Sequence, residues 1–352
     1  MHRQREGLTI GAKRVLIVDD SPTIRQLIRT LLANDRRLRV VGEAGDPYEA
    51  REKIKDLAPD VITLDVEMPR MNGLSFLEKL MRLRPMPVVM VSTETQKGSA
   101  AALEALSLGA IDCIGKPASG ALDEAFQNLG DLLVAAADAR LREPGLRKPV
   151  DPATGFRWNG RYVLIGSSTG GVDALETILS EFPENCPPTL ITQHMPETFL
   201  ESFVRRLAPK IAPRFELATD NAPLLQGKVY IAPGGAYHLG VSGGDTPKCK
   251  LLSDEKRNGH RPSVDVLFDS ARPIAQRSVA CLLTGMGRDG AEGMLALRQA
   301  GATCIAQDQA TSVVFGMPRA ALEIGAAERA VPLGRIAQNI LQLTGRTSAV
   351  SV

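Results

Sequence analysis

Short, uninterrupted apolar runs alternate with helical patterns along most of this chain, and the alternation occurs in two separate blocks. In the first block, Val15–Val18 and Val61–Leu64 are such runs, and each precedes a stretch with apolar residues at three- and four-residue spacing. Continuous apolar runs are typical of strands that are buried on both faces, as in parallel sheets covered by helices. The pattern therefore predicts an α/β fold with two doubly wound domains.

The first block is predicted to span residues 13–141 and to form a five-stranded parallel sheet. Residues 142–160 contain several prolines and glycines with little apolar periodicity, which indicates a linker. The second block, residues 161–346, has strand candidates at 162–166, 189–193, 228–232, 278–284 and 303–306. We expect a mostly parallel, Rossmann-like sheet with an inserted β-hairpin at residues 237–252, and terminal tails at 1–12 and 347–352.

Charge and cysteine content exclude several classes of function. The net charge is +2, with 19 basic and 20 acidic side chains in residues 1–141 and 19 basic and 18 acidic in residues 161–352. Neither block has the positive excess that binding to phosphate backbones requires, so we expect no nucleic-acid partner. The five cysteines have no metal-ligand spacing and are expected to be reduced. No apolar run approaches membrane-spanning length, which favours a cytoplasmic protein without direct membrane insertion.

Carboxylates follow two predicted strands of the first block. Asp19 and Asp20 close the first strand, and Asp65 closes the third. In an open parallel sheet these ends meet at one edge, where three carboxylates would repel one another unless a divalent cation such as Mg²⁺ neutralised them. Ser92 and Lys116 follow the fourth and fifth strands and would complete a phosphoryl-binding site. Strand-end aspartates are also common helix caps, but all five positions in register are a more specific signal.

Residues 13–141 resemble a response-regulator receiver domain. The resemblance rests on the motifs Val18-Asp19-Asp20-Ser21, Leu64–Pro69 with Asn72-Gly73, and Lys116-Pro117. It implies that Asp65 is the phosphoacceptor, that Asp19, Asp20, Asp65 and the Glu67 carbonyl bind Mg²⁺, and that Ser92 and Lys116 contact the phosphoryl group. It also implies a sensor histidine kinase as phosphodonor. Cys113 lies where receivers often carry an aromatic switch residue, which is a departure from the family pattern.

A glycine-flanked serine follows the first strand of the second block. Ser168 lies within Gly166-Ser167-Ser168-Thr169-Gly170-Gly171, between an apolar run and a helical pattern. On such a turn a serine can act as a nucleophile, with backbone N–H groups of the next helix facing an oxyanion. The same turn can also bind a phosphate or a dinucleotide. Taken alone, the motif favours a catalytic serine and a phosphate or dinucleotide site about equally.

Ser168 would need a base and a carboxylate that orients it. The chain has four histidines, and His194 directly follows the next predicted strand, at the same sheet edge as Ser168. His2 lies in the tail, whereas His238 and His260 lie in the hairpin and in a polar loop. Asp289 follows the strand 279–283 on a glycine-rich turn, although it could also be a simple helix cap.

Two absences weigh against a nucleotide site. No Lys-Ser/Thr pair ends the Ser168 loop, so it is not a P-loop, and Gln193 and His194 stand where a ribose-binding acid would be. The order Ser…His…Asp also differs from the Ser…Asp…His order of α/β-hydrolases, so the similarity to them is chemical rather than topological.

Residues 161–346 resemble the catalytic domain of chemotaxis protein-glutamate methylesterases of the CheB type. The matching segments are 166–171, 193–196, 231–235, 283–290 and 313–319. The resemblance implies that Ser168 is the nucleophile, His194 the general base and acid, and Asp289 its orienter. Thr169 and the Met286 backbone are implied as transition-state contacts.

The activity that this implies is hydrolysis of glutamate γ-methyl esters on methylated chemoreceptor cytoplasmic domains, with methanol released and with glutamine deamidation as a second reaction. No cofactor is expected for ester hydrolysis. Phosphorylation of the receiver would relieve an inhibitory packing of the two domains. A receiver-coupled binding module without turnover is the alternative from another class, and a methylated receptor outside chemotaxis is an alternative substrate.

Overall fold

The computed structural model describes residues 11–92, 96–116, 126, 128–139 and 155–346, and it describes no side chains for residues 96–99. It divides into two compact units, one of residues 1–93 and 108–141 and the other of residues 94–107 and 142–352. Residues 1–10 and 347–352, most of the expected linker, His2, Pro117 and the start of the helix expected after Gly120 lie outside the described residues. Within the described residues, no helix is long and apolar enough to span a membrane.

The first unit contains a five-stranded sheet in the order β2-β1-β3-β4-β5, and every pairing in it is parallel. Its strands are β1 (Lys13–Val18), β2 (Leu38–Ala44), β3 (Val61–Asp65), β4 (Val88–Ser92) and β5 (Asp112–Gly115). The helices along this part of the chain are α1 (Pro22–Leu32), α2 (Pro47–Leu57), α3 (Gly73–Leu83), α4 (Gln96–Ser107) and α6 (Leu129–Ala137). Helix α4 is grouped with the second unit. All residues of β3 and β4 are buried, which explains their continuous apolar runs.

Helix starts in the first unit follow local capping chemistry. The Ser21 hydroxyl accepts the Ile24 N–H at 3.5 Å, and the Asp46 carboxylate accepts the Tyr48 and Glu49 N–H groups at 2.8 and 3.1 Å. Each cap precedes a proline at the first helical position, where a missing N–H is tolerated. The Glu49 carboxylate reaches back to the Gly45 N–H at 2.7 Å, one residue beyond the cap itself.

The second unit contains a seven-stranded parallel sheet in the order β14-β13-β12-β6-β7-β9-β8. Its strands are β6 (Tyr162–Ser167), β7 (Thr189–Gln193), β8 (Arg214–Leu217), β9 (Lys228–Ile231), β12 (Ser278–Leu282), β13 (Thr303–Gln307) and β14 (Arg329–Val331). Strands β10 (His238–Ser242) and β11 (Lys248–Leu252) pair as the predicted antiparallel hairpin. The predicted α/β fold class with its five-stranded sheet is confirmed, but the sequence did not identify β8 and β14, which are short edge strands with charged residues.

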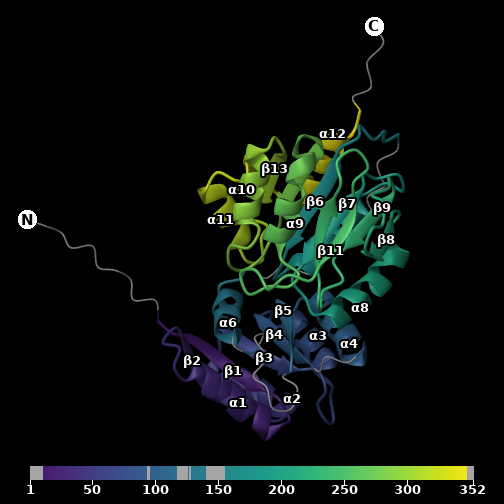
Figure 1. The fold of residues 1–352 in the computed structure, drawn as a ribbon. Helices are drawn as coiled ribbons and strands as arrows, with labels where there is room; N and C mark the ends of the chain where they lie inside the picture. Colours follow the sequence, from purple (N-terminus) through teal and green to yellow (C-terminus); the bar gives the residue numbers. More distant parts are fainter. Residues whose placement is uncertain (1–10, 93–95, 117–125, 127, 140–154, 347–352) are drawn as a thin grey trace, which may run out of the picture. The chain divides into compact units, whose positions relative to one another are not determined.

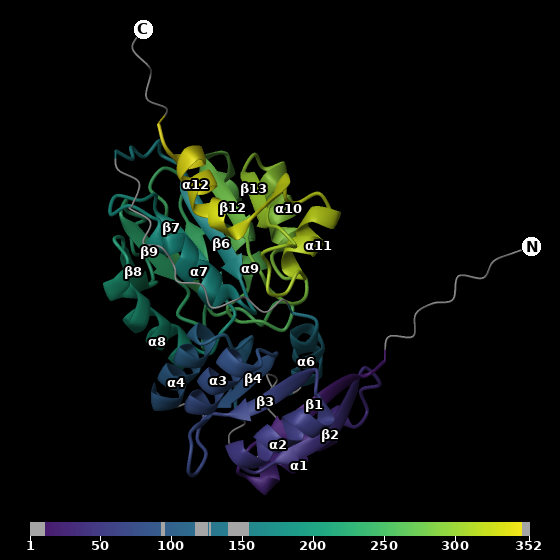
Figure 2. The ribbon, with the colours of Figure 1, turned by 180° about the vertical axis from the view of Figure 1, so that it is seen from behind.

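Helices cover both faces of the seven-stranded sheet. Helices α9 (Val264–Ser270), α10 (Ala291–Gln299) and α11 (Met317–Glu323) lie on one face (Figure 1), and α7 (Gly171–Ser180), α8 (Glu197–Leu207) and α12 (Leu333–Thr344) lie on the other (Figure 2). Successive residues of β6 alternate between the two resulting cores: Leu164 packs in the first and Ile165 in the second. Both layers need apolar residues, so the strand has a continuous apolar run at Val163–Ile165.

The three strands that precede the candidate catalytic residues are neighbours in the sheet. Strand β6 pairs with β12 on one side and with β7 on the other, with Gly166 beside Leu282 and Ser167 beside Gln193. Because all three strands are parallel, their carboxyl ends open at the same edge. The loops that follow them carry Ser168, His194 and Asp289.

Candidate active site

Ser168 lies on the tight turn between β6 and α7. Its N–H donates to the Thr284 carbonyl at 3.0 Å, and its own carbonyl accepts the Gly171 N–H at 2.7 Å and the Gln193 side-chain amide at 3.0 Å. A Cβ added at Gly285 would lie 2.7 Å from the Ser168 Cβ, closer than two such atoms can approach. Glycine at position 285 is therefore required so that the β12 loop can pass beside the serine.

His194 continues β7 past its last residue and lies beside the serine turn. Its N–H donates to the Ser167 carbonyl at 3.1 Å, which extends the pairing of Ser167 with Gln193. Among the described residues, no hydrogen bond joins the Ser168 hydroxyl to the His194 ring. Such bonds often tighten only when substrate is bound, so the arrangement remains suited to proton transfer.

The two ring nitrogens of His194 have different surroundings. Nε2 lies 2.8 Å from Asp289 Oδ2, whereas Nδ1 is buried and has no hydrogen-bond partner within the described part of the chain. A carboxylate accepts and does not donate, so Asp289 selects the neutral tautomer that carries its proton on Nε2. Nδ1 is then the nitrogen that can accept a proton from Ser168.

Asp289 is buried and its carboxylate accepts hydrogen bonds on both oxygens. Oδ2 accepts the Val264 N–H at 2.7 Å in addition to the His194 bond, and Oδ1 accepts from the Ser263 hydroxyl at 2.8 Å, from the Asn258 amide at 3.0 Å and from the Asp265 N–H at 3.3 Å. Burial would raise the pKa of Asp289, but the bonds from His194, Asn258 and Val264 outweigh it and hold this pKa below its ordinary value. Asp289 is therefore ionised at every pH at which His194 can accept a proton.

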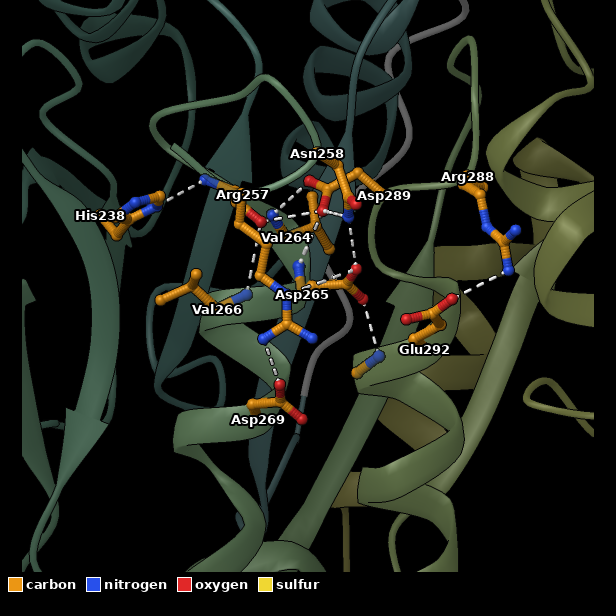
Figure 3. A network of polar contacts seen from close by, with 12 residues as sticks. His238, Arg257, Asn258, Val264, Asp265, Val266, Asp269, Arg288, Asp289 and Glu292 are labelled. Carbon is orange, nitrogen blue, oxygen red and sulfur yellow. Dashed lines mark hydrogen bonds and ion pairs between the residues drawn. The ribbon is translucent and has the colours of Figure 1, made fainter. Parts of the chain in front are cut away.

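A second buried carboxylate, Asp265, lies beside Asp289 in the same polar network (Figure 3). It accepts the Gly293 N–H at 2.7 Å and the Asn258 amide at 2.7 Å. Burial raises the pKa of Asp265 to about 6, with a further contribution from the negative charge of Asp289. The sequence reasoning did not identify Asn258, Ser263 or Asp265, although Asn258-Gly259 is a typical turn dipeptide and Ser263 caps α9.

The other described histidines have distinct positions. His260 stacks on His194, with ring centroids 3.8 Å apart and planes 10° from parallel. His238 is fully buried, and its Nδ1 accepts the Ser263 N–H at 3.0 Å while Nε2 lies 3.1 Å from the Glu255 carbonyl. His238 thus supports Ser263, which in turn donates to Asp289.

The two residues expected to contact the transition state lie on loops next to Ser168. Thr169 is buried, and its carbonyl accepts the Thr284 hydroxyl at 2.9 Å. Met286 is half-buried and directly follows Gly285, which packs against Ser168. Among the hydrogen bonds of the described residues, none uses the Met286 N–H, so this donor is available to a ligand.

The first unit brings its predicted carboxylates together at the carboxyl edge of its sheet. One oxygen each of Asp19, Asp20 and Asp65 lies within 4.8 Å of the others. Lys116 Nζ lies 3.0 Å from Asp19 and 2.9 Å from Asp65. Burial raises the pKa of Asp65 to about 6, against the opposing effect of the Lys116 hydrogen bond, and burial also raises the pKa of Asp19. An oxygen-only cluster with one exposed member fits Mg²⁺, which retains several waters.

Three further residues that the sequence singled out lie near this first site: Ser92, Glu67 and Cys113. Ser92 is buried at the end of β4, and its carbonyl accepts the Lys116 N–H at 2.6 Å, which brings the two strand ends together. The N–H of the exposed Glu67 donates to Asp65 Oδ1 at 3.2 Å. Cys113 is half-buried in β5, three residues before Lys116.

Comparison with known proteins identifies a family for each of the two domains. The CheB methylesterase family model matches residues 163–340, and the response regulator receiver domain model matches residues 15–127. The protein-glutamate methylesterase/protein-glutamine glutaminase of Rhizobium etli is 54% identical over 94% of this chain and 96% of its own length. A protein of the same name from Caulobacter vibrioides is also 54% identical, over 94% of this chain and 97% of its own.

A solved structure agrees with the second unit. The crystal structure of the Thermotoga maritima CheB methylesterase catalytic domain covers 53% of this chain and 100% of its own, with 37% identity and a TM-score of 0.51. The family models, the full-length relatives and the parallel sheet that carries Ser168, His194 and Asp289 point to one conclusion. This chain belongs to the CheB methylesterase family and carries a response regulator receiver domain in front of its esterase domain.

Proposed function

We propose that this protein is a phosphorylation-activated protein-glutamate methylesterase that acts on methylated chemoreceptor cytoplasmic domains and also deamidates their glutamine side chains. The observation that carries the proposal is the His194–Asp289 pair beside the Ser168 turn, with Nδ1 of His194 left unpaired among the described residues. The names of the relatives, protein-glutamate methylesterase/protein-glutamine glutaminase, support methylated glutamates and glutamines of proteins as the substrate groups. We assign the receiver to residues 13–141, the linker to 142–160 and the esterase to 161–346, and we place the protein in the cytoplasm.

The first half of the reaction forms an acyl-enzyme. His194 Nδ1 takes the Ser168 hydroxyl proton while Ser168 Oγ attacks the γ-carbonyl carbon of the methylated glutamate. The negative charge that develops on the carbonyl oxygen is stabilised by donors at Thr169 and the Met286 N–H. The tetrahedral intermediate collapses, the bond to the methoxy oxygen breaks, and His194 returns the proton so that methanol leaves.

The second half restores the enzyme. His194 Nδ1 takes a proton from water, whose oxygen attacks the acyl carbon. The bond to Ser168 Oγ then breaks, and the serine recovers its proton from His194, leaving a free glutamate. With a glutamine substrate the leaving group is ammonia in place of methanol. Throughout, Asp289 keeps the Nε2 proton in place and stabilises the positive charge that His194 gains.

The receiver controls this reaction through Asp65. A carboxylate oxygen of Asp65 attacks the phosphorus of a phosphohistidine or of a small phosphodonor, the bond from phosphorus to the histidine nitrogen or to the donor's leaving-group oxygen breaks, and that group departs. Lys116 and the Ser92 hydroxyl then stabilise the phosphoryl oxygens on Asp65. Asp19, Asp20, Asp65 and the Glu67 carbonyl would hold Mg²⁺, which supplies charge neutralisation for phosphoryl transfer. Phosphorylation then shifts an equilibrium between a restricted and an accessible esterase, which requires a differential free energy of a few kcal/mol.

The direct test is the release of methanol from methylated receptor membranes. Ser168→Ala should lower the rate by several orders of magnitude, as is typical for a triad nucleophile. Full release by this variant would refute the mechanism. A fluorophosphonate that labels the wild type but not Ser168→Ala would exclude a binding module without turnover.

Regulation is tested separately. Deleting residues 1–150 should raise the basal rate, because the inhibitory domain is removed. An unchanged or lower rate in a fragment that still folds would contradict the inhibitory role. Mass spectrometry of receptor peptides, with and without the protein, would identify which glutamates are demethylated.

A further inference from the structure

A tight turn at residues 257–260 lies against the His194–Asp289 pair. Its two ends pair through backbone bonds, Arg257 N–H to the His260 carbonyl at 3.1 Å and His260 N–H to the Arg257 carbonyl at 2.9 Å. Asn258 has φ 53° and Gly259 has φ 77°, the left-handed pair that two-residue hairpin turns prefer. This turn therefore projects Asn258 in a defined direction, while His260 stacks on His194.

The Asn258 side chain joins two buried carboxylates. Its Nδ2 atom lies 2.7 Å from Asp265 Oδ2 and 3.0 Å from Asp289 Oδ1. Figure 3 draws both contacts as dashed lines. A side-chain amide nitrogen carries two hydrogens, so one can go to each carboxylate. A neutral donor between two negative groups offsets part of their repulsion without introducing a competing charge.

The hydrogen-bond donors to Asp289 come from different segments of the chain. The Ser263 hydroxyl and the Val264 and Asp265 N–H groups all come from one short segment at the start of α9. Asn258 reaches Asp289 from the separate turn, and Arg257 of the same turn pairs with Asp269 at 2.5 Å. Among the described residues, Asn258 and His194 are thus the two donors to Asp289 that come from outside this segment.

We propose that Asn258 is a positioning residue for ester hydrolysis: its bridge between Asp265 and Asp289 fixes the Asp289 carboxylate and thereby orients the His194 ring for proton transfer from Ser168. This inference rests on the proposed function. Without the bridge, the carboxylate rotates more freely and a smaller fraction of enzyme holds the reactive orientation. The loss should therefore fall on kcat and not on substrate binding.

The test compares the same substitution at two left-handed asparagines of the full-length protein. Asn258→Gly removes the side-chain amide, and glycine can still adopt the positive φ of this position. Asn221→Gly is the matched control, because Asn221 has φ 60° and, among the described residues, its exposed side-chain amide donates only to the neighbouring Asp220. We expect Asn258→Gly to lower kcat for methanol release between about 10- and 100-fold with KM within about twofold, and Asn221→Gly to leave both unchanged. Asn258→Asp, which sets a third carboxylate against the other two, should lose at least as much.

A spectroscopic measurement reads the positioning without turnover. The His194 Nε2 proton, hydrogen-bonded to Asp289, should give a downfield proton resonance, assigned by its loss in His194→Gln. Asn258→Gly should shift or broaden this resonance, and Asn221→Gly should not. An unchanged resonance and kcat in Asn258→Gly, or equal losses in Asn221→Gly, would overturn the inference. A different result would overturn the proposed function and leave the bridge supported: the wild type releases no methanol, but Asn258→Gly still shifts or broadens the resonance relative to the wild type.

Discussion

Replacing Asp289 by asparagine removes one negative charge next to the His194 imidazole while the side chain keeps its shape. In the wild type this charge lies 2.8 Å from His194 Nε2, and burial excludes water from both groups. The new amide would set N–H hydrogens against some of the five donors that now surround the carboxylate. If its NH₂ faced His194, the imidazole would also be driven to the other tautomer, and Nδ1 could no longer accept the serine proton.

The size of the effect follows from the separation of the charges. Two unit charges 2.8 Å apart interact by roughly 6 kcal/mol at an effective dielectric constant of about 20. This energy stabilises the imidazolium that forms in the transition state, and each 1.36 kcal/mol corresponds to about tenfold in rate. Since an amide oxygen retains part of the interaction, we expect kcat to fall between about 10³- and 10⁴-fold, the scale known for the same change in serine triads.

The assay is methanol release from methylated receptor membranes, with Asp245→Asn as the matched control at an exposed position of the hairpin turn. The control should retain the wild-type rate. Comparison of melting temperatures would show that Asp289→Asn is folded. A folded Asp289→Asn protein that stays within about tenfold of the wild-type kcat would refute the role of this charge.

Three further predictions concern other positions. Gly285→Ala places a Cβ 2.7 Å from that of Ser168 and should lower kcat at least about tenfold, whereas Gly244→Ala, with open space around it, should not. Asp65→Asn should abolish stimulation by an acyl phosphate and leave basal methanol release intact, and retained stimulation would contradict it. Because folding raises the pKa of Asp265 from 3.8 to about 6, its contribution favours folding below about pH 4 and is lost as the pH rises through about 6. Denaturant titrations should show the stability of the wild type relative to Asp265→Asn falling by roughly 2–3 kcal/mol between pH 4 and 7, and a constant difference would contradict this.

The parallel sheets were predictable because burial on both faces leaves a local signal. Strands such as β3 and β6 are buried at every position and are therefore mostly apolar, and this can be seen without knowing their neighbours. The edge strands β8 and β14 carry no such signal, since one side of each faces no partner strand and charged residues are tolerated. Their existence depends on the sheet beside them.

For the candidate site, the sequence by itself pointed to Ser168, His194 and Asp289, because strand ends in a parallel sheet meet at one edge. It did not determine which imidazole nitrogen faces Asp289, and it did not reveal Asn258 or Asp265 beside the carboxylate. Those contacts join residues 24 to 95 positions apart along the chain. Local patterns record burial and backbone conformation, whereas the direction of a side chain depends on every element that packs around it. The tertiary structure alone therefore decided that Nδ1 is the ring nitrogen of His194 without a hydrogen-bond partner among the described residues, and that a turn asparagine joins the two carboxylates.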